Sequence, residues 1–493
     1  MSLARGRGSC RPLRWTASPS CYARLAASPA PISNILRPCL LAASRRRIHS
    51  SEKRTSTLAG HPMPDPLPPN VNVAVRAPLS VLSLTMVLRS LATTIVSSSP
   101  VLLPPSLRIM AALANSHNPV LNPDRNPLLR FFLKKTFYAQ FCAGENAVEV
   151  HRTISGLKNI GFTGVILCYA KEVVLTSDQA KSLGEPAKET DDALKNEILP
   201  WAEGTLETVR LVQPGDYVAL KFTGAGSLAL AQLKARLPAT PTLYKCIDDI
   251  CQLAQQRGVR LLFDAEQDML QDGIDDWTIE FARKYNSGVN DPVIYGTYQA
   301  YKKACPEVLS NHLALAQKDK FSLGVKLVRG AYLGSDPRHL FHDTKEDTDK
   351  CYDTLAASVL SRKWSSSVKG EGEYPPSSLM IASHNAESVR RARAICDAGA
   401  AKSDVSFAQL QGMADEVSCE LVEAGQTARK EKGNKAPALP AYKYLVWGTT
   451  GECMKYLLRR AQENKDAVQR TRDSRDAMWT ELVRRCKSVV GMA

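Results

Sequence analysis

The first 51 residues of this chain contain no aspartate and no glutamate, although the whole sequence of 493 residues has 49 acidic side chains. Nine arginines lie in that acid-free stretch and supply more than half of the formal net charge of +15. The rest of the chain is only mildly basic, so we expect no nucleic-acid partner. A segment rich in Arg, Ser and Ala and without acids is typical of a mitochondrial transit peptide, which we predict, disordered, over residues 1–50. A basic arm that binds nucleic acid is the alternative, but no basic helix or interleaved aromatics follow it.

The thirteen cysteines include no C-x-x-C pair and show no regular spacing. This distribution argues against a disulfide framework and against a zinc site, and it is typical of a reducing compartment. His339 and His342 form an H-x-x-H motif with no cysteine or third ligand nearby. We therefore interpret them as surface histidines and expect no metal.

Long uncharged apolar runs are also lacking. In APLSVLSLTMVLRSLATTIV (77–96), Leu84, Leu88, Leu91 and Ile95 recur at helical spacing around a single charge, Arg89. A central arginine costs a membrane-spanning helix about 2.5–3.5 kcal/mol on the insertion scale. We therefore predict a helix that lies on a membrane surface or packs on the core, and rank a true span behind both. Residues 51–125 are assigned as a linker and amphipathic helical arm.

After residue 160 the sequence alternates between short β-rich runs and charged, helix-like stretches. Eight such runs predict an α/β protein with a (β/α)8 barrel, the TIM-barrel fold, within a domain at 126–493. Two polar segments, 363–378 and 425–440, are predicted to be insertions or mobile loops. The predicted strands are 162–167, 217–222, 260–266, 292–299, 324–330, 379–385, 405–410 and 442–447.

Polar side chains follow several of these strands at the point where each one ends. In a (β/α)8 barrel the carboxyl ends of the strands carry the working residues, so this placement predicts a site there. The residues concerned are Lys221, Asp264, Glu266, Gln299, His384 and Asn385.

The motif KLVRGAY (326–332) places two cations in an apolar strand, where an unpaired charge is costly. Side chains alternate across a strand, so Lys326 and Arg329 point in opposite directions. We predict that Lys326 faces the barrel mouth and that Arg329 pairs with an acid in the helical layer. Gly330 would let a flat ligand approach the backbone closely.

Two further motifs have competing interpretations. In YLLRRAQEN (456–464), helical spacing lets Arg459 and Arg460 both reach Glu463, which would preorganise them for a carboxylate. The alternative is a solvated ion-pair face. GAGSLA (224–229) matches a loose dinucleotide-binding pattern, but no half of a doubly wound sheet precedes it, so a Rossmann site is disfavoured.

Taken in order, these motifs resemble the proline dehydrogenases, also called proline oxidases, and the fungal mitochondrial type in particular. The similarity runs from about residue 125 to 470 through KFTGAG, LLFDAE, YGTYQAY, KLVRGAY, ASHNAESV, FAQLQGM and YLVWGTTGECMKYLLRRAQEN. It implies a distorted (β/α)8 barrel with non-covalent FAD at its carboxyl end, oxidation of L-proline to Δ1-pyrroline-5-carboxylate and transfer of electrons to a membrane quinone. It also implies peripheral contact with the inner mitochondrial membrane, on its matrix side.

The resemblance further implies roles for individual residues. A tyrosine at position 444 accompanies proline as the substrate, whereas smaller residues accompany hydroxyproline. The implied substrate-site residues are Lys221, Asp264, Tyr332, Tyr444, Arg459, Arg460 and Glu463, with Leu410 as an apolar contact to the proline ring. The implied FAD contacts are Gln299, Lys326, Val328, Gly330, Lys345, Thr348, His384, Asn385 and Gln409.

Two other functions remain open from the sequence. One is a Schiff-base aldolase or phosphosugar barrel with Lys221 or Lys326 as nucleophile, which would be colourless and would form a trappable covalent adduct. The other is a membrane-bound mitochondrial scaffold that interacts mainly through residues 77–96.

Overall fold

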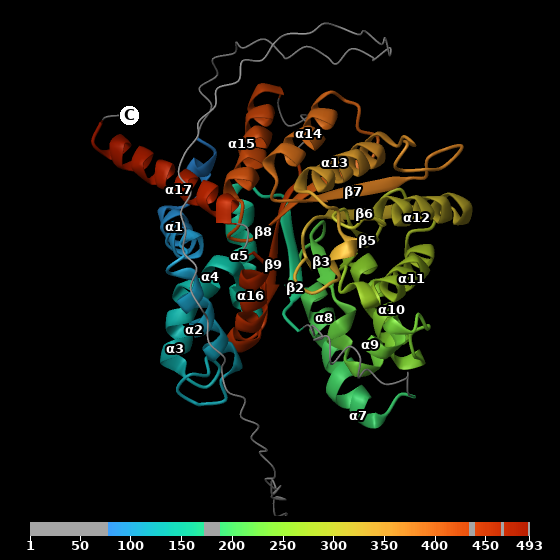
Figure 1. Cartoon of the computed structure of the whole chain (residues 1–493), viewed down its shortest axis with the longest axis horizontal. Helices are drawn as coiled ribbons and strands as arrows, with labels where there is room; N and C mark the ends of the chain where they lie inside the picture. The colour runs from blue at the N-terminus through green and yellow to red at the C-terminus, as the bar shows by residue number, and fades with distance from the viewer. Residues whose placement is uncertain (1–76, 172–187, 433–438, 465–467, 492–493) are drawn as a thin grey trace, which may run out of the picture. The chain divides into compact units, whose positions relative to one another are not determined.

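Eight parallel strands pair side by side and close into a barrel (Figure 1). They follow one another around the barrel in chain order, and β9 closes it by pairing with both β8 and β2. The (β/α)8 prediction is thus confirmed, and each predicted strand overlaps an observed one. The strands are β2 (Gly164–Tyr169), β3 (Tyr217–Leu220), β4 (Arg260–Phe263), β5 (Ile294–Gln299), β6 (Leu323–Val328), β7 (Ser377–Ala382), β8 (Asp404–Leu410) and β9 (Ala441–Trp447).

The computed structural model describes residues 77–171, 188–432, 439–464 and 468–491, all within one unit, Asn72–Ala493. The predicted transit peptide and the linker up to residue 76 lie outside the described residues. The domain boundary predicted at residue 126 stays a prediction.

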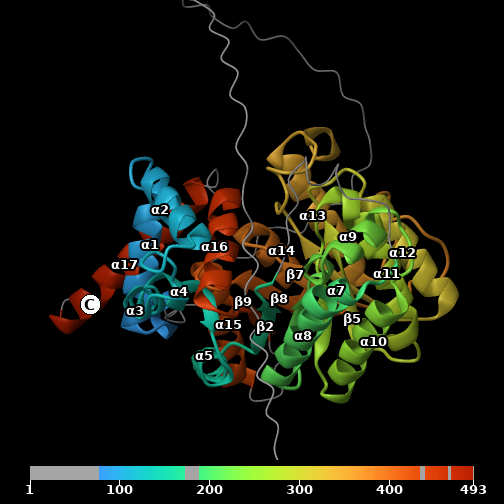
Figure 2. The same cartoon turned by 90° about the horizontal axis from the view of Figure 1, so that it is seen from below.

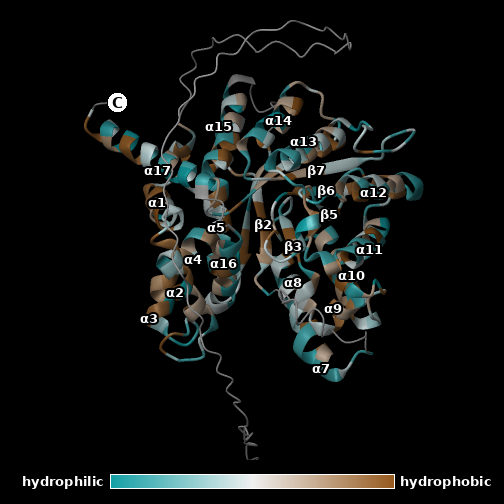
Figure 3. Ribbon diagram, in the orientation of Figure 1, coloured by the Kyte–Doolittle hydropathy of each residue, from teal (hydrophilic) through white to brown (hydrophobic). Residues whose placement is uncertain are grey.

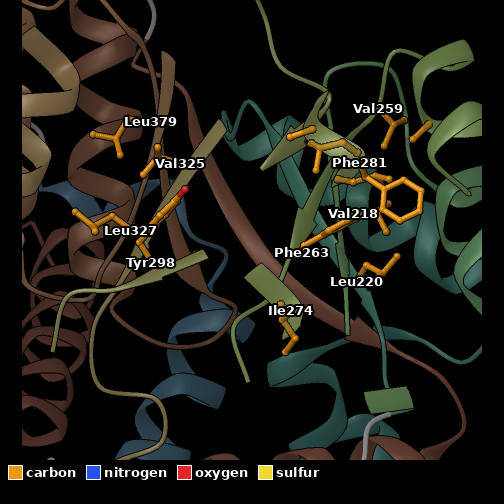
Figure 4. Close-up of a cluster of buried hydrophobic side chains, with 14 of the residues drawn as sticks. Val218, Leu220, Val259, Phe263, Ile274, Phe281, Tyr298, Val325, Leu327 and Leu379 are labelled. Carbon is orange, nitrogen blue, oxygen red and sulfur yellow. The ribbon is translucent and has the colours of Figure 1, made fainter. Parts of the chain in front are cut away.

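Strand residues alternate between two apolar layers. On β2, Val165 and Leu167 join the layer between the barrel and its helices, whereas Ile166 and Cys168 join the layer inside the barrel. Figure 4 shows part of the outer layer, in which Val218 and Leu220 of β3 lie near Phe263 of β4. This alternation follows from the two-residue period of a strand, and it leaves the last inward-facing positions for polar groups.

Helices cover the outside of the barrel and continue beyond it on one side. Those between successive barrel strands are α7 (Asp191–Ala193), α8 (Leu199–Leu211), α9 (Ser227–Lys234), α10 (Pro241–Gln256), α11 (Asp268–Tyr285), α12 (Cys305–Asp319), α13 (Lys345–Ser361), α14 (Ala386–Asp397) and α15 (Asp415–Lys432). The others are α1 (Leu84–Ser98), α2 (Leu103–Asn115), α3 (Pro127–Lys135), α4 (Phe137–Phe141), α5 (Ala147–Ile160), α16 (Thr450–Asn464) and α17 (Val468–Val489).

The helix that follows the last barrel strand departs from the regular pattern. Helix α16 packs against α2, α3 and α4, while α5 packs against β1 and β2. In both views α1 to α4, α16 and α17 gather on the same side of the barrel (Figure 1 and Figure 2). A ninth strand, β1 (Cys142–Gly144), pairs with β9, and the sequence analysis did not predict it. This arrangement accounts for the predicted distortion.

The predicted helix in the segment 77–96 forms as α1, but its apolar stripe is not its buried face. Leu91 is buried, whereas Leu84, Leu88 and Ile95 are exposed. Helix α1 packs on α17 through another face, which includes Val87. The helix therefore packs on the rest of the protein through Val87 and Leu91, while three of the four residues of the predicted stripe stay exposed.

Among the described residues, no single helix is both long and apolar enough to cross a bilayer. Helices α1 and α2 pass that test only as a pair, with a bend of 107° between them. A second correction concerns the predicted loop at 425–440, because α15 continues to Lys432.

Candidate active site

A buried cluster of charges lies where β3, β4 and β6 end. The carboxylate of Asp264 accepts hydrogen bonds from Lys326 Nζ at 2.5 Å and from Lys221 Nζ at 3.0 Å. All three residues are at most 7% exposed. The anion that the apolar strand of KLVRGAY required is therefore Asp264, which follows β4, two strands away from β6 around the barrel.

Opposing effects act on the carboxyl group of Asp264. Its burial, the largest effect, works to raise the pKa, but the charges of Lys221 and Lys326 and their hydrogen bonds outweigh it. The pKa of Asp264 therefore falls well below its usual range, and the group is ionised at neutral pH. Two cations and one anion leave this cluster with a net positive charge.

Tyr444 of β9 joins the same cluster from the opposite side of the barrel. Its hydroxyl donates to Asp264 Oδ2 at 3.0 Å, and Lys326 Nζ lies 5.3 Å from the centre of its ring. Burial, followed by the negative charge of Asp264, raises the pKa of Tyr444 well above its usual value. The phenol therefore stays protonated and donates its hydrogen bond.

Arg329 points away from this cluster, as the alternation of the strand predicted. Its guanidinium forms an ion pair with Asp349 of α13 and donates to Ser388 Oγ of α14 at 3.0 Å. It also lies over the ring of Tyr352, 5.2 Å from its centre. Arg329 thus ties the strand to two covering helices, which is a structural role.

The segment after β6 is held by a hydrogen-bonded chain that starts at β5. Tyr301 donates its hydroxyl hydrogen to Gln299 Oε1, and the same hydroxyl oxygen accepts the backbone N–H of Tyr332 at 3.2 Å. Two residues before Tyr332, Gly330 has φ = +75°, a conformation that favours glycine. A Cβ added at Gly330 would meet only Leu333, at 3.8 Å, so the space beside this backbone is open.

Helix α16 brings the predicted arginine pair together with its acid. The carboxylate of Glu463 lies 2.8 Å from Arg460 Nη1 and 3.7 Å from Arg459 Nη1. Both guanidiniums also lie over the ring of Tyr456, 5.3 and 6.0 Å from its centre. All three charged side chains are less than a fifth exposed, so the solvated-face alternative does not hold.

A cavity of about 980 Å³ lies between the barrel and helices α1, α2 and α16. Tyr444, Leu410 and Arg460 line it at the barrel, whereas Leu88 and Ile109 line it at α1 and α2. Tyr444 connects this cavity to the buried cluster through its hydrogen bond to Asp264, and Arg460 connects it to the arginine pair of α16. Sequence reasoning missed Tyr456 and the helix α2 side of this cavity, and periodicity within α16 and α2 gave no signal for either.

The predicted residues on β7 and β8 form a separate polar group. His384 Nε2 accepts the backbone N–H of Leu410 at 3.1 Å, and Gln409 Nε2 donates to the backbone carbonyl of Ser383 at 3.2 Å. Burial, followed by the charges of Arg470 and of two other cations, lowers the pKa of His384 well below its usual value. The imidazole is therefore neutral.

Lys345 and Thr348 lie in the first turn of α13. Lys345 is exposed and bonds Asp349, while Thr348 bonds its own helix through the carbonyl of Thr344. Asn385 Oδ1 caps α14 by accepting the N–H groups of Glu387 and Ser388 at 2.9 and 3.3 Å. The cofactor role of Lys345 and Thr348 stays a prediction.

The loose dinucleotide motif at 224–229 is already occupied by a side chain. Glu197 accepts hydrogen bonds from the backbone N–H and the hydroxyl of Ser227, at the start of α9. A Cβ added at Gly226 would also collide with Glu197. A phosphate would have to displace this carboxylate, so the Rossmann interpretation is excluded on physical grounds.

The fold is that of a (β/α)8 barrel, and the candidate site lies at the carboxyl end of its strands, where enzymes with this fold have their active sites. The family model for proline dehydrogenase matches residues 150–473, so the chain belongs to the proline dehydrogenase family. This result confirms the resemblance seen in the motifs.

Individual relatives agree with the family match. A probable mitochondrial proline dehydrogenase from Schizosaccharomyces pombe is 28% identical over 73% of this chain and 80% of its own length. A hydroxyproline dehydrogenase from Bos taurus is 28% identical over 72% of this chain and 81% of its own length. Proline utilization A from Bdellovibrio bacteriovorus has a similar fold, with a TM-score of 0.54 and 17% identity over 73% of this chain and 37% of that one.

Proposed function

We propose that this protein oxidises L-proline to Δ1-pyrroline-5-carboxylate, with bound FAD accepting hydride at N5, and passes the electrons to a membrane quinone. Family membership supports this proposal over the Schiff-base aldolase and the scaffold. The observation that carries it is the convergence of cations from β3, β6 and α16 around Tyr444. Charged groups this distant in sequence gather inside a protein when an anionic ligand offsets their burial.

The substrate's carboxylate is assigned to the arginine pair and Lys221. Arg459, Arg460 and Glu463 together carry one surplus positive charge, and the cluster of Lys221, Lys326 and Asp264 carries another. Glu463 holds the guanidiniums in place before substrate arrives, which reduces the entropy lost on binding. A bidentate pair of N–H groups would orient the carboxylate and with it the ring.

FAD fits the residues around the end of β6. The open backbone at Gly330 leaves room for a flat ring, and Gln299 and Lys326 present polar groups toward the same end of the barrel. We assign the isoalloxazine end to these residues and to Val328. His384, Asn385 and Gln409 are assigned to the rest of the cofactor, with Lys345 and Thr348 at its far end. Lys326 would stabilise the negative charge that accompanies reduction.

Tyr444 supports proline over hydroxyproline as the substrate. The hydrogen bond to Asp264 fixes its ring, which is 9% exposed, and the ring also lines the cavity. A hydroxyl added to the substrate ring would need space that this fixed side chain takes up. Leu410 provides an apolar wall of the same cavity.

Location and electron acceptor are proposed on the same basis. The relative from S. pombe is named mitochondrial, and the acid-free, arginine-rich start of this chain is of the kind that directs import. We place the protein on the matrix side of the inner mitochondrial membrane in peripheral contact with it, where it would reach a lipid-soluble quinone.

An absorption spectrum of the purified protein tests the proposed reaction directly. We expect a flavin band that L-proline bleaches under anaerobic conditions. Arg460→Ala should keep the flavin band but lose bleaching at substrate concentrations that suffice for the wild type, because the carboxylate loses a bidentate partner.

The matched control is Arg393→Ala, which removes an arginine with a similar intrahelical ion pair on α14, to Asp397. This variant should bleach like the wild type. A colourless protein would contradict the FAD assignment, and normal bleaching in Arg460→Ala would contradict the carboxylate clamp.

A further inference from the structure

Exposed apolar side chains are concentrated on α1, α2, α3 and the segments between them. Of the nineteen large hydrophobic residues that are exposed in the described part of the chain, eleven lie between Leu84 and Phe132. The most exposed are Leu128 at 79% and Val101 at 75%, followed by Val120, Phe131 and Phe132. We call this exposed set the α1–α3 face. The brown segments of these helices are visible in Figure 3. Such a concentration in about a tenth of the chain indicates an interaction surface.

The same stretch is strongly basic. Residues 77–136 contain six cations, including Arg108, Arg130 and Lys135, and a single acid, Asp124. The carboxylate of Asp124 accepts the backbone N–H of Gly451 at 2.8 Å, so it is engaged within the protein. Lys135 Nζ lies 5.8 Å from the centre of the Phe131 ring, which places a charge next to an exposed aromatic side chain. Apolar side chains with interspersed cations are typical of helices that lie in the interface of an anionic bilayer.

The large cavity opens within this face. Leu88, Ile109 and Phe132 come from α1, α2 and α3, and each of them both lines the cavity and is exposed. The other end of the cavity reaches Tyr444 and Arg460. Exposing the apolar side chains of this opening to water is unfavourable, and contact with the hydrocarbon of a bilayer would remove that exposure. Helices α1 and α2 meet at a bend of 107°, so the pair does not form one straight helix across a bilayer.

We propose that the α1–α3 face docks this protein on an anionic phospholipid bilayer, with the exposed leucines and phenylalanines in the interface and the cations on the lipid phosphates. This inference specifies the surface and the lipid charge for the proposed membrane contact, and it stands independently of the proposed reaction. Docking through this face turns the mouth of the cavity toward the hydrocarbon. An apolar acceptor dissolved in the bilayer then reaches the barrel without crossing water.

Two other partners could cover such a face, namely a second copy of the chain and another segment of the same chain. The charge distribution favours lipid, because a self-complementary interface between two copies would bring the surplus cations together. Flotation of the wild type with vesicles would separate lipid from the other two, and the oligomeric state of a protein that does not float would separate a second copy from another segment.

Flotation of the full-length protein with vesicles tests the proposal. Equal parts of phosphatidylglycerol and phosphatidylcholine give the anionic probe, and pure phosphatidylcholine gives the neutral one. Wild type should float with the anionic vesicles, and its partition coefficient should fall about tenfold on neutral vesicles or at high salt. The double variant Leu128→Glu/Phe131→Glu should lose at least about tenfold on anionic vesicles.

The control, Val148→Glu/Leu237→Glu, adds the same charge at two exposed apolar residues on α5 and after α9, and it should partition like the wild type. Proline oxidation with a water-soluble dye should be equal in all three proteins, because none of the substituted residues lines the cavity. If Leu128→Glu/Phe131→Glu floats like the wild type, the proposal is wrong. If the wild type is a dimer, the variant is a monomer and neither floats with vesicles, the α1–α3 face binds a second copy of the chain instead. A wild-type protein that floats with anionic vesicles but does not oxidise proline with the dye would contradict only the proposed reaction.

Discussion

Asp264 is a single carboxylate that faces two buried ammonium groups. Neither lysine is more than 7% exposed, so each depends on this acid for its stability in the interior. Breaking a buried ion pair by removing one partner typically costs about 3–5 kcal/mol, because the remaining charge is left without compensation. The same residue that organises the candidate site therefore contributes to the folding of the barrel.

Asp264→Asn tests this dependence. The amide has the same shape but no charge, so it would leave Lys221 and Lys326 close together without an anion. We expect the free energy of unfolding to fall by about 3–5 kcal/mol and proline oxidation to be lost. Denaturant unfolding followed by circular dichroism measures the first effect, and the anaerobic bleaching assay measures the second.

A second variant separates charge from shape. Asp264→Asn/Lys221→Met removes one cation together with the acid, and it should recover a substantial part of the lost stability but none of the activity. If the single variant proves as stable as the wild type, the lysines do not depend on Asp264 and the interpretation of the cluster fails.

At the scale of elements, the loops above the barrel are joined by another buried lysine. Lys302 is 7% exposed and pairs with Asp268, at the start of α11, and with Asp336, after β6. The nitrogen lies 2.8 and 3.0 Å from these carboxylates. One side chain thus holds the segment that carries Tyr332 against the start of a neighbouring helix.

Lys302→Met should release that segment. We expect a loss of about 3 kcal/mol in the free energy of unfolding, because two acids lose a buried cation. Amide hydrogen exchange over residues 330–341 should also become faster than in the wild type. Mass spectrometry of exchanged peptides measures this effect.

The neighbouring residue provides the control. Lys303 is half exposed and pairs with Asp343 at 3.1 Å, so Lys303→Met should cost no more than about 1 kcal/mol and leave exchange in 330–341 unchanged. Equal effects of the two substitutions would show that burial of the lysine is not what holds the loop.

At the scale of the whole molecule, the sequence predicted the eight barrel strands because each one is an apolar run bounded by polar segments. It predicted Asp264 at the end of a strand and Lys326 facing the barrel mouth, but not the bond between them, which joins residues 62 positions apart. Strand β1 was missed because three residues show no periodicity. The opening of the cavity among α1, α2 and α3 was missed because the packing of α16 on α2 depends on contacts between distant segments. The exposed position of Leu84 and Leu88 likewise depends on which face α17 covers.

The stability of the whole protein should depend on pH through two buried groups that act in opposite directions. Burial lowers the pKa of His312 to about 4, and burial together with neighbouring acids raises the pKa of Asp275 to about 7. The unfolded histidine binds a proton that the folded one rejects between pH 4 and about 6.5, so this group makes stability rise with pH. Folded Asp275 keeps a proton that the unfolded chain releases from about pH 4 to 7, so this group makes stability fall.

At full effect His312 changes the free energy of unfolding by about 3 kcal/mol and Asp275 by about 4 kcal/mol. Their effects nearly cancel below about pH 6.5, and above it the free energy of unfolding falls toward pH 8. Asp275→Asn should therefore be more stable than the wild type at pH 8 by up to about 4 kcal/mol, and the difference should vanish near pH 4. His312→Asn should show the opposite trend, with its gain confined to acidic pH. Denaturant unfolding at each pH gives the difference curves, in which all other titrating groups cancel. A difference for Asp275→Asn that does not change between pH 4 and pH 8 would mean that Asp275 remains ionised in the folded protein.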